Sequence, residues 1–383
     1  MPMLYDEGRR TDQSPHRYSE PLSQFLDRTG RVAYDQVRRV MNDWFGHYCR
    51  EERAGLHAAI RRGEDKAFLA AYWELYLHES LRRTFAHVDC HPSLPGTGRR
   101  PDFRAVGDAS SMFVEARLAW ETERQTLGTA RLGRLYDAIN GISCPNFILD
   151  LDVDDEGPRE PNTRYLRSHL RRWLATLDVD TELRRAEVRV DRTSTTWTDG
   201  GWSLSVEAFP LQPEHRNLPD HRPLGSSSTG GEQIDGVTPI RKSLREKSKA
   251  YGDIKEPFII ALRTDWRSDI SAMANALFGT RVVRYTQNLG SNNRVWWERQ
   301  QDGFWNAGRN AHVSGVLVCE ELFPWNMTTV TPRLWLNPAA ERPCAVLPLW
   351  ERAAVRNGRV VRDPAAITGP AYFGLADRWP GGW

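Results

Sequence analysis

The chain has 383 residues, of which 40% are hydrophobic, enough for two domains or for one large core with additions. Its net charge is only +2, so the molecule as a whole is not a polybasic nucleic-acid binder. The longest apolar runs fall well short of the roughly 20 residues that cross a membrane, and residues 1–10 lack the apolar stretch of a secretory signal. We therefore expect a cytoplasmic protein without a membrane partner.

The cysteines are scattered along the chain without a CxxC pair, at Cys49, Cys90, Cys144, Cys319 and Cys344. This spacing argues against a zinc ribbon and against a framework of disulfides, and it fits a reducing compartment. Three histidines, His78, His87 and His91, suggest zinc as an alternative. Their spacing shows no fourth ligand, so we expect ordinary core or surface side chains.

Helices are expected after a polar N-terminal arm. Apolar side chains recur at helical spacing from Val32 to about Arg53, and again from Asp65 to about Phe85. The second helix is apolar almost all round, which predicts that it is buried. Glu74 lies in its middle, and a buried carboxylate needs a partner, either an arginine or the shell of a metal ion.

Three strands, a helix and a buried strand are expected next. The strands are expected over 86–91, 102–106 and 112–118, the helix over 129–140 and the buried strand over 147–153. This order is typical of an α/β core in which helices cover both faces of a mixed sheet.

The second half of the chain predicts further elements of both kinds. A helix is expected over 164–177, and a hairpin with strands over 187–190 and 202–209 turns at Gly200-Gly201. Residues 211–238 are rich in Pro, Gly and Ser and predict a flexible loop. The remaining expected elements are a helix from about Pro239, a strand over 257–262, a helix over 269–279 and a strand over 313–319.

The lysines of this arginine-rich chain are concentrated in one place. Four of the five lie within fourteen residues, at Lys242, Lys247, Lys249 and Lys255. Either selection for a function keeps them there, or they cluster by chance on a solvated helix.

Asp102 and Glu115 carry the strongest chemical signal. Asp102 opens one expected strand after Pro101, and Glu115 lies thirteen residues later on the next. A short turn over 107–110 would place the two carboxylates side by side on antiparallel strands. Two close carboxylates repel each other unless a cation neutralises them, and Mg²⁺ prefers carboxylate oxygens together with waters and phosphate oxygens. Taken singly, Asp102 would be a turn cap and Glu115 an ion-pair partner.

Residues 65–155 resemble the PD-(D/E)XK nuclease superfamily, in an actinobacterial branch. The resemblance rests on Pro101-Asp102, on Glu115-Ala116-Arg117 and on a preceding helix that carries Glu74. It implies a restriction-endonuclease-like mixed sheet flanked by helices, with Asp102 and Glu115 as ligands of Mg²⁺ (or Mn²⁺) and Glu74 acting through water. It also implies a metal-dependent nuclease that hydrolyses DNA or RNA, with bacterial defence against foreign nucleic acid as one role.

The chain departs from the superfamily pattern at Arg117, where the family usually has lysine. Arginine stays charged and cannot act as a base, although it can hold a phosphate. Three explanations stay open: Arg117 acts electrostatically, a lysine from another element replaces it, or the site is inactive. The lysine candidates are Lys242, Lys247 and Lys249, of which we place Lys242 and Lys249 first.

Arginines around the expected site favour contact with nucleic acid. Phosphate contacts of such groups give affinity without reading sequence, and a solvated charged face is the alternative. The candidates are Arg99, Arg100 and Arg104 beside Asp102, and Arg131 and Arg134 on the next helix. An inactive site would instead indicate a nucleic-acid-binding or scaffold subunit, in a homo-oligomer or a multi-protein complex.

The chain is accordingly divided into four expected segments. They are an N-terminal arm and helix (1–60), a nuclease-like core (61–210), a flexible loop (211–238) and an elaborated C-terminal part with the lysine helix, strands and a Trp-rich region (239–383).

Overall fold

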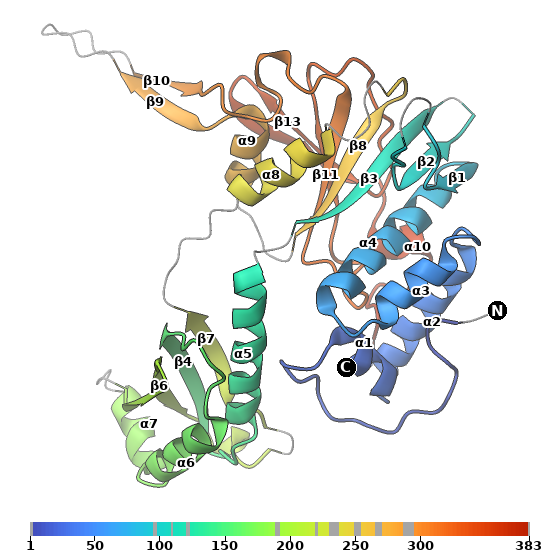
Figure 1. Ribbon diagram of the computed structural model, residues 1–383. Coiled ribbons are helices and arrows are strands. Elements are labelled where there is room, and N and C mark those ends of the chain that lie inside the picture. Colours follow the sequence, from blue (N-terminus) through green and yellow to red (C-terminus); the bar gives the residue numbers. More distant parts are fainter. Residues whose placement is uncertain are drawn as a thin grey trace, which may run out of the picture. The chain divides into compact units, whose positions relative to one another are not determined.

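The computed structural model describes residues 3–94, 98–108, 110–119, 123–187, 192–218, 221–229, 237–248, 254–264, 270–285 and 295–381. The chain separates into two compact units (Figure 1). Unit 1 consists of Met1–Pro15, Pro21–Trp120 and Asp235–Trp383, and unit 2 of His16–Glu20 and Glu121–Ile234. The units do not follow the expected segments, because the expected core of 61–210 is shared between them.

An eight-stranded mixed sheet lies at the centre of unit 1, in the order β1-β2-β3-β8-β11-β12-β13-β14. Strands β1, β2 and β3 are antiparallel neighbours, whereas β3, β8 and β11 run parallel. The strands are β1 (His87–Cys90), β2 (Phe103–Val106), β3 (Ser111–Ala119), β8 (Phe258–Thr264), β11 (Val313–Glu320), β12 (Arg333–Leu336), β13 (Glu351–Arg356) and β14 (Arg359–Asp363). The expected α/β class, a large mixed sheet flanked by helices, is confirmed.

Helices cover both faces of this sheet, as the alternation of side chains along β8 shows. Ile259 and Ala261 belong to the hydrophobic core beneath the N-terminal helices, while Ile260 and Leu262 belong to the core on the other face. The first core contains side chains of α1 (Leu22–Arg28), α2 (Val32–His47), α3 (Arg53–Arg61), α4 (Asp65–Arg82) and α10 (Gly369–Phe373). The second contains side chains of α8 (Val237–Ser248) and α9 (Ile270–Phe278).

The chain order within unit 1 is α4, β1, β2, β3, α8, β8, because unit 2 is inserted between β3 and α8. The sequence favoured the helix over 129–140 and the strand over 147–153 as the continuation of this core. Both belong to unit 2, as parts of α5 (Glu123–Asn140) and β4 (Phe147–Asp155). The helix and strand that complete the sheet beside β3 are therefore α8 and β8.

Unit 2 contains a four-stranded sheet in the order β5-β6-β4-β7. Its elements are α5, β4, α6 (Thr163–Leu174), α7 (Val179–Glu187), β5 (Ser194–Asp199), β6 (Trp202–Pro210), a 3-10 turn at Pro213–His215 and β7 (Leu224–Thr229). Unit 2 differs from the sequence-based expectations in two places. The stretch 211–238 is not all loop, because β7 pairs in parallel with β4. The hairpin partner of β6 is β5, while Glu187 ends α7 and residues 188–190 lie outside the described part of the chain.

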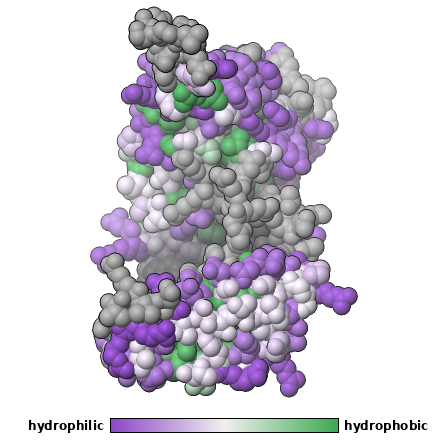
Figure 2. Space-filling view, turned by 90° about the vertical axis from the view of Figure 1, so that its left-hand side faces the viewer, coloured by the Kyte–Doolittle hydropathy of each residue, from purple (hydrophilic) through white to green (hydrophobic). Residues whose placement is uncertain are grey.

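The remaining elements are a two-stranded ribbon of β9 (Arg281–Tyr285) and β10 (Val295–Arg299) and a 3-10 turn at Asn306–Gly308. Among the described residues, no helix has the length and apolar character to cross a membrane. The described surface in Figure 2 is largely hydrophilic, and its hydrophobic areas are small and separated.

Candidate metal centre

Strands β2 and β3 bring Asp102 and Glu115 together. Their register pairs Phe103 with Val114, so the next pair along the two strands is Asp102 and Glu115. The carboxylate of Asp102 (Oδ2) accepts a hydrogen bond of 2.6 Å from the backbone N–H of Ala116. Glu115 lies in the middle of β3, between β2 and β8, and is only 1% exposed.

Glu74 adds a third carboxylate from α4. The pKa of Glu74 is raised to about 7, first by burial and then by the negative charge of Glu115, against the opposing positive charge of Lys247. Burial likewise raises the pKa of Asp102 to about 8, with contributions from the charges of Glu115 and Glu74. The three acidic groups thus lie close enough to disfavour each other's ionisation. Keeping all three ionised would require a nearby cation to offset their repulsion.

Lys247 supplies positive charge from α8. Its ammonium group (Nζ) donates a hydrogen bond to Oε1 of Glu115. Lys242, which we had placed first, is exposed and lines a separate surface pocket with Arg241, Glu246 and Asp302. Lys249 lies outside the described residues.

Helical spacing contained the signal that favours Lys247 over Lys242. The buried side chains of α8 are Ile240, Leu244 and Ser248, at the spacing of one helix face. Lys247 is three residues after Leu244 and falls on that face, whereas Lys242 falls on the opposite one.

Arg117 contacts α8. Its guanidinium group forms an ion pair of 3.2 Å with Glu246, the residue before Lys247. Because side chains two residues apart on a strand share a face, Arg117 and Glu115 point to the same side of β3. Arg117 therefore connects β3 with the helix that carries the lysine.

Two aromatic residues next to the carboxylates were not predicted. The ring of His91 (Nδ1) lies 3.7 Å from Oδ1 of Asp102, and the backbone N–H of His91 donates to the carbonyl oxygen of Asp102 at 2.8 Å. Tyr48 is buried, and its pKa is raised by burial and then by the charges of Glu74 and Asp102. Pairing the expected strand over 86–91 with the next expected strand, over 102–106, would have placed His91 there.

The five arginines proposed to contact nucleic acid lie in different settings. Arg99 and Arg100 are exposed. Arg104 forms an ion pair of 3.0 Å with Glu256. Arg131 and Arg134 belong to unit 2, where Arg131 donates to the carbonyl oxygen of Pro158 at 2.8 Å and Arg134 pairs with Glu160.

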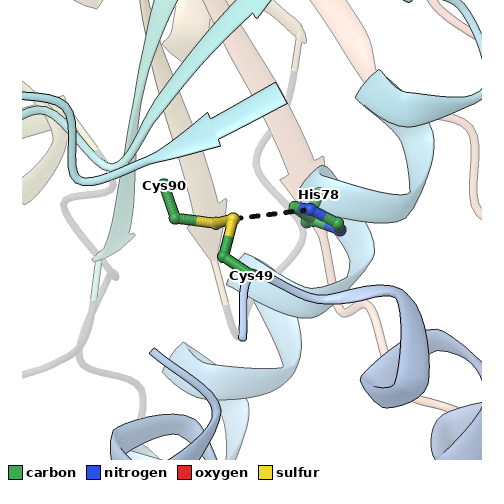
Figure 3. Close-up of side chains that lie close together, drawn as sticks. All are labelled: Cys49, His78 and Cys90. Carbon is green, nitrogen blue, oxygen red and sulfur yellow. Dashed lines mark hydrogen bonds between the residues drawn. A yellow bond between two sulfur atoms is a disulfide. The ribbon is translucent and has the colours of Figure 1, made fainter. Parts of the chain in front are cut away.

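A disulfide joins Cys49 and Cys90, contrary to the expectation of unpaired cysteines (Figure 3). The two residues are 41 positions apart, and the fold brings the end of α2 beside the end of β1, so their spacing in sequence gives no sign of the pairing. His78 of α4 lies against them, with its Nε2 atom 3.9 Å from the sulfur of Cys49. The three other cysteines are free.

No family model, no curated protein and no solved structure matches this chain.

Proposed function

We propose that this chain is a metal-dependent nuclease with a restriction-endonuclease-like core, which hydrolyses phosphodiester bonds in DNA or RNA. The observation that carries the proposal is that Asp102 and Glu115, on neighbouring strands, lie close to the carboxylate of Glu74 from α4 and the ammonium group of Lys247 from α8. The order α4, β1, β2, β3, α8, β8 supports it, because it is the helix, three strands, helix and strand expected for such a core.

The donor set fits a hard divalent cation. All three acidic groups offer carboxylate oxygens, which Mg²⁺ and Mn²⁺ prefer, and none offers sulfur. Asp102 and Glu115 would hold the ion, and Glu74 of α4 would orient a water beside it. When bound, Mg²⁺ would supply Lewis acidity toward a phosphodiester and a polarised water.

Lys247 would perform the role that the superfamily usually gives to the lysine at the position of Arg117. Its ammonium group touches Glu115, so it lies where negative charge on a reacting phosphate would be offset. A lysine can also release a proton, which arginine cannot do. Arg117 would hold α8 in position through Glu246.

Cleavage assays on purified full-length protein test the proposal. Plasmid, single-stranded DNA and RNA would each be incubated with Mg²⁺, Mn²⁺ or EDTA. We expect cutting that EDTA abolishes and that the double variant Asp102→Ala/Glu115→Ala lacks. Asp108→Ala, which removes an exposed carboxylate from the β2–β3 turn, is the matched control and should cut normally.

The second candidate is a nuclease-fold protein without catalysis that binds nucleic acid or acts as a scaffold subunit. Arg117 in the usual place of lysine favours it. Folded protein that cuts none of these substrates with any metal, but binds one of them, would establish this second function and overturn the first.

A further inference from the structure

We propose that Cys49, His78 and Cys90 form a second metal site, which takes a soft or borderline divalent cation such as Zn²⁺ once their disulfide is reduced. The site is distinct in chemistry from the acidic centre, because its donors are two sulfurs and an imidazole nitrogen. Thiolate and imidazole ligands select Zn²⁺ over Mg²⁺, so the two centres would not compete for the same ion.

The three donors lie close together, and reduction of the disulfide would let the two sulfurs move apart to the spacing of metal ligands. Sγ of Cys49, Sγ of Cys90 and a ring nitrogen of His78 all lie within 4.8 Å of one another. The 3.9 Å between Sγ of Cys49 and Nε2 of His78 is close to the roughly 3.6 Å that separates a sulfur and a nitrogen bound to one tetrahedral Zn²⁺. The donors come from the end of α2, from α4 and from the end of β1 (Figure 3).

His78 provides independent support. It is 3% exposed, and Nδ1 is buried without a hydrogen-bond partner among the described residues. Its other nitrogen faces the sulfur of Cys49. The rings of Tyr48 and Phe103 pack against it, with centroids 4.9 and 6.0 Å away. With its proton on Nδ1, the ring would present the lone pair of Nε2 toward the sulfurs, where it could bind a metal ion.

An open cavity gives access to this site. The cavity has a volume of about 650 Å³, and Cys49, His78 and Cys90 lie in its wall together with His47 and Asp89. A reductant can therefore reach the disulfide, and a metal ion can reach the sulfurs. The fourth coordination position would face the cavity and hold a water.

The redox change is a two-electron exchange. A dithiol reductant transfers two electrons and two protons to Cys49–Cys90, so the S–S bond breaks, two thiols form, and the dithiol becomes a disulfide. Zn²⁺ then displaces both thiol protons as two S–Zn bonds form. A disulfide oxidant reverses the exchange by accepting the two electrons, and the metal ion leaves.

Titration of the full-length protein with Co²⁺ as a spectroscopic substitute tests the inference. Oxidised protein should show no thiolate-to-cobalt charge-transfer band, and reduced protein should show one that saturates at one equivalent and disappears when Zn²⁺ is added. Cys49→Ser and Cys90→Ser should each abolish the band, and His78→Gln should weaken binding at least tenfold. Cys344→Ser removes a free, partly buried cysteine and should bind as wild type. A band that survives both serine variants, or none in reduced protein, would overturn the proposal.

Alkylation of the wild-type chain avoids variants that fail to fold. Reduced protein would be treated with iodoacetamide with and without Zn²⁺, and the modified cysteines mapped by mass spectrometry. Zn²⁺ should slow modification of Cys49 and Cys90 at least tenfold and leave Cys344 unchanged. Equal rates at Cys49 and Cys90 with and without Zn²⁺, or loss of the folded circular dichroism spectrum on reduction, would contradict the site.

Discussion

Lys247 donates a hydrogen bond to the buried carboxylate of Glu115 across 132 positions of sequence. One partner is on α8, after the inserted unit 2, and the other is on β3, before it. A charge as buried as that of Glu115 needs such a partner, because an unpaired buried carboxylate is strongly destabilising. The pair therefore fixes α8 on the sheet, and in the proposed nuclease it also delivers the lysine.

Replacing Lys247 and Lys242 one at a time shows which lysine of α8 contributes to cleavage. We expect Lys247→Met to reduce the single-turnover cleavage rate by about 10²–10³, the usual effect of losing a group that stabilises transition-state charge. Lys242→Met, on the opposite helix face, should leave the rate within about twofold. Equal rates for the two variants would remove Lys247 from the mechanism.

Moving the lysine tests whether position or mere charge matters. Arg117→Lys in the Lys247→Met background places an ammonium group two residues after Glu115, on the same side of β3. We expect this double variant to cut at least about tenfold faster than Lys247→Met alone, since transition-state charge is again offset. Failure to rescue, with the fold intact by circular dichroism, would indicate that only α8 can present the lysine.

Neutralising Asp102 should stabilise the metal-free protein. The pKa of Asp102 is raised to about 8 in the folded protein from 3.8, so ionisation of Asp102 destabilises the folded state. The free energy of unfolding therefore falls as the pH rises from about 4 to about 8. In EDTA at pH 8 we expect Asp102→Asn to raise the free energy of unfolding by about 1–3 kcal/mol, and the gain should vanish near pH 4.

The same variant should also lose the response to metal. On the proposed function, Mg²⁺ would stabilise the wild-type protein by binding its folded form, and Asp102→Asn removes one of the two proposed ligands. Thermal unfolding in EDTA measures the gain in stability without metal, and thermal unfolding in Mg²⁺ measures the loss of stabilisation by metal. Asp108→Asn, at an exposed position, is the control. A wild-type melting temperature that Mg²⁺ leaves unchanged would argue against a metal centre here.

Reducing the disulfide should lower the stability of unit 1. The Cys49–Cys90 bond closes a loop of 41 residues, and a chain-entropy estimate for such a loop is about 4 kcal/mol. We expect Cys49→Ser/Cys90→Ser to unfold at lower denaturant concentration than wild type without reductant. Under reducing conditions with EDTA the two proteins should unfold nearly alike. A difference that persists there would mean that the serines themselves disturb the core.

Local patterns were enough to predict much of unit 1. The apolar run from Asp65 predicted the buried helix α4, and the strand-like segments 102–106 and 112–118 predicted β2 and β3 with their short turn. The proximity of Asp102 and Glu115 follows from those two strands alone. Each of these features depends on residues that are close together in the sequence, so each could be predicted from the sequence alone.

Long-range pairing could not be predicted in the same way. The apolar run at Pro257 indicated a strand, but nothing in it showed that β8 lies parallel to β3 while the nearer β4 belongs to unit 2. The disulfide depends on the same kind of long-range packing. The choice of Lys247 over Lys242 was different, since helical spacing held that information.

The insertion of unit 2 between β3 and α8 affects how the protein is made. A ribosome that adds 5–20 residues per second needs roughly 7–26 seconds to pass from Glu115 to Lys247. During that interval the nascent chain carries the proposed acidic ligands but lacks the lysine. On the proposed function, a truncated product that ends within unit 2 would be inactive. For the same reason, the unfinished nuclease would not cleave the messenger RNA from which it is being translated.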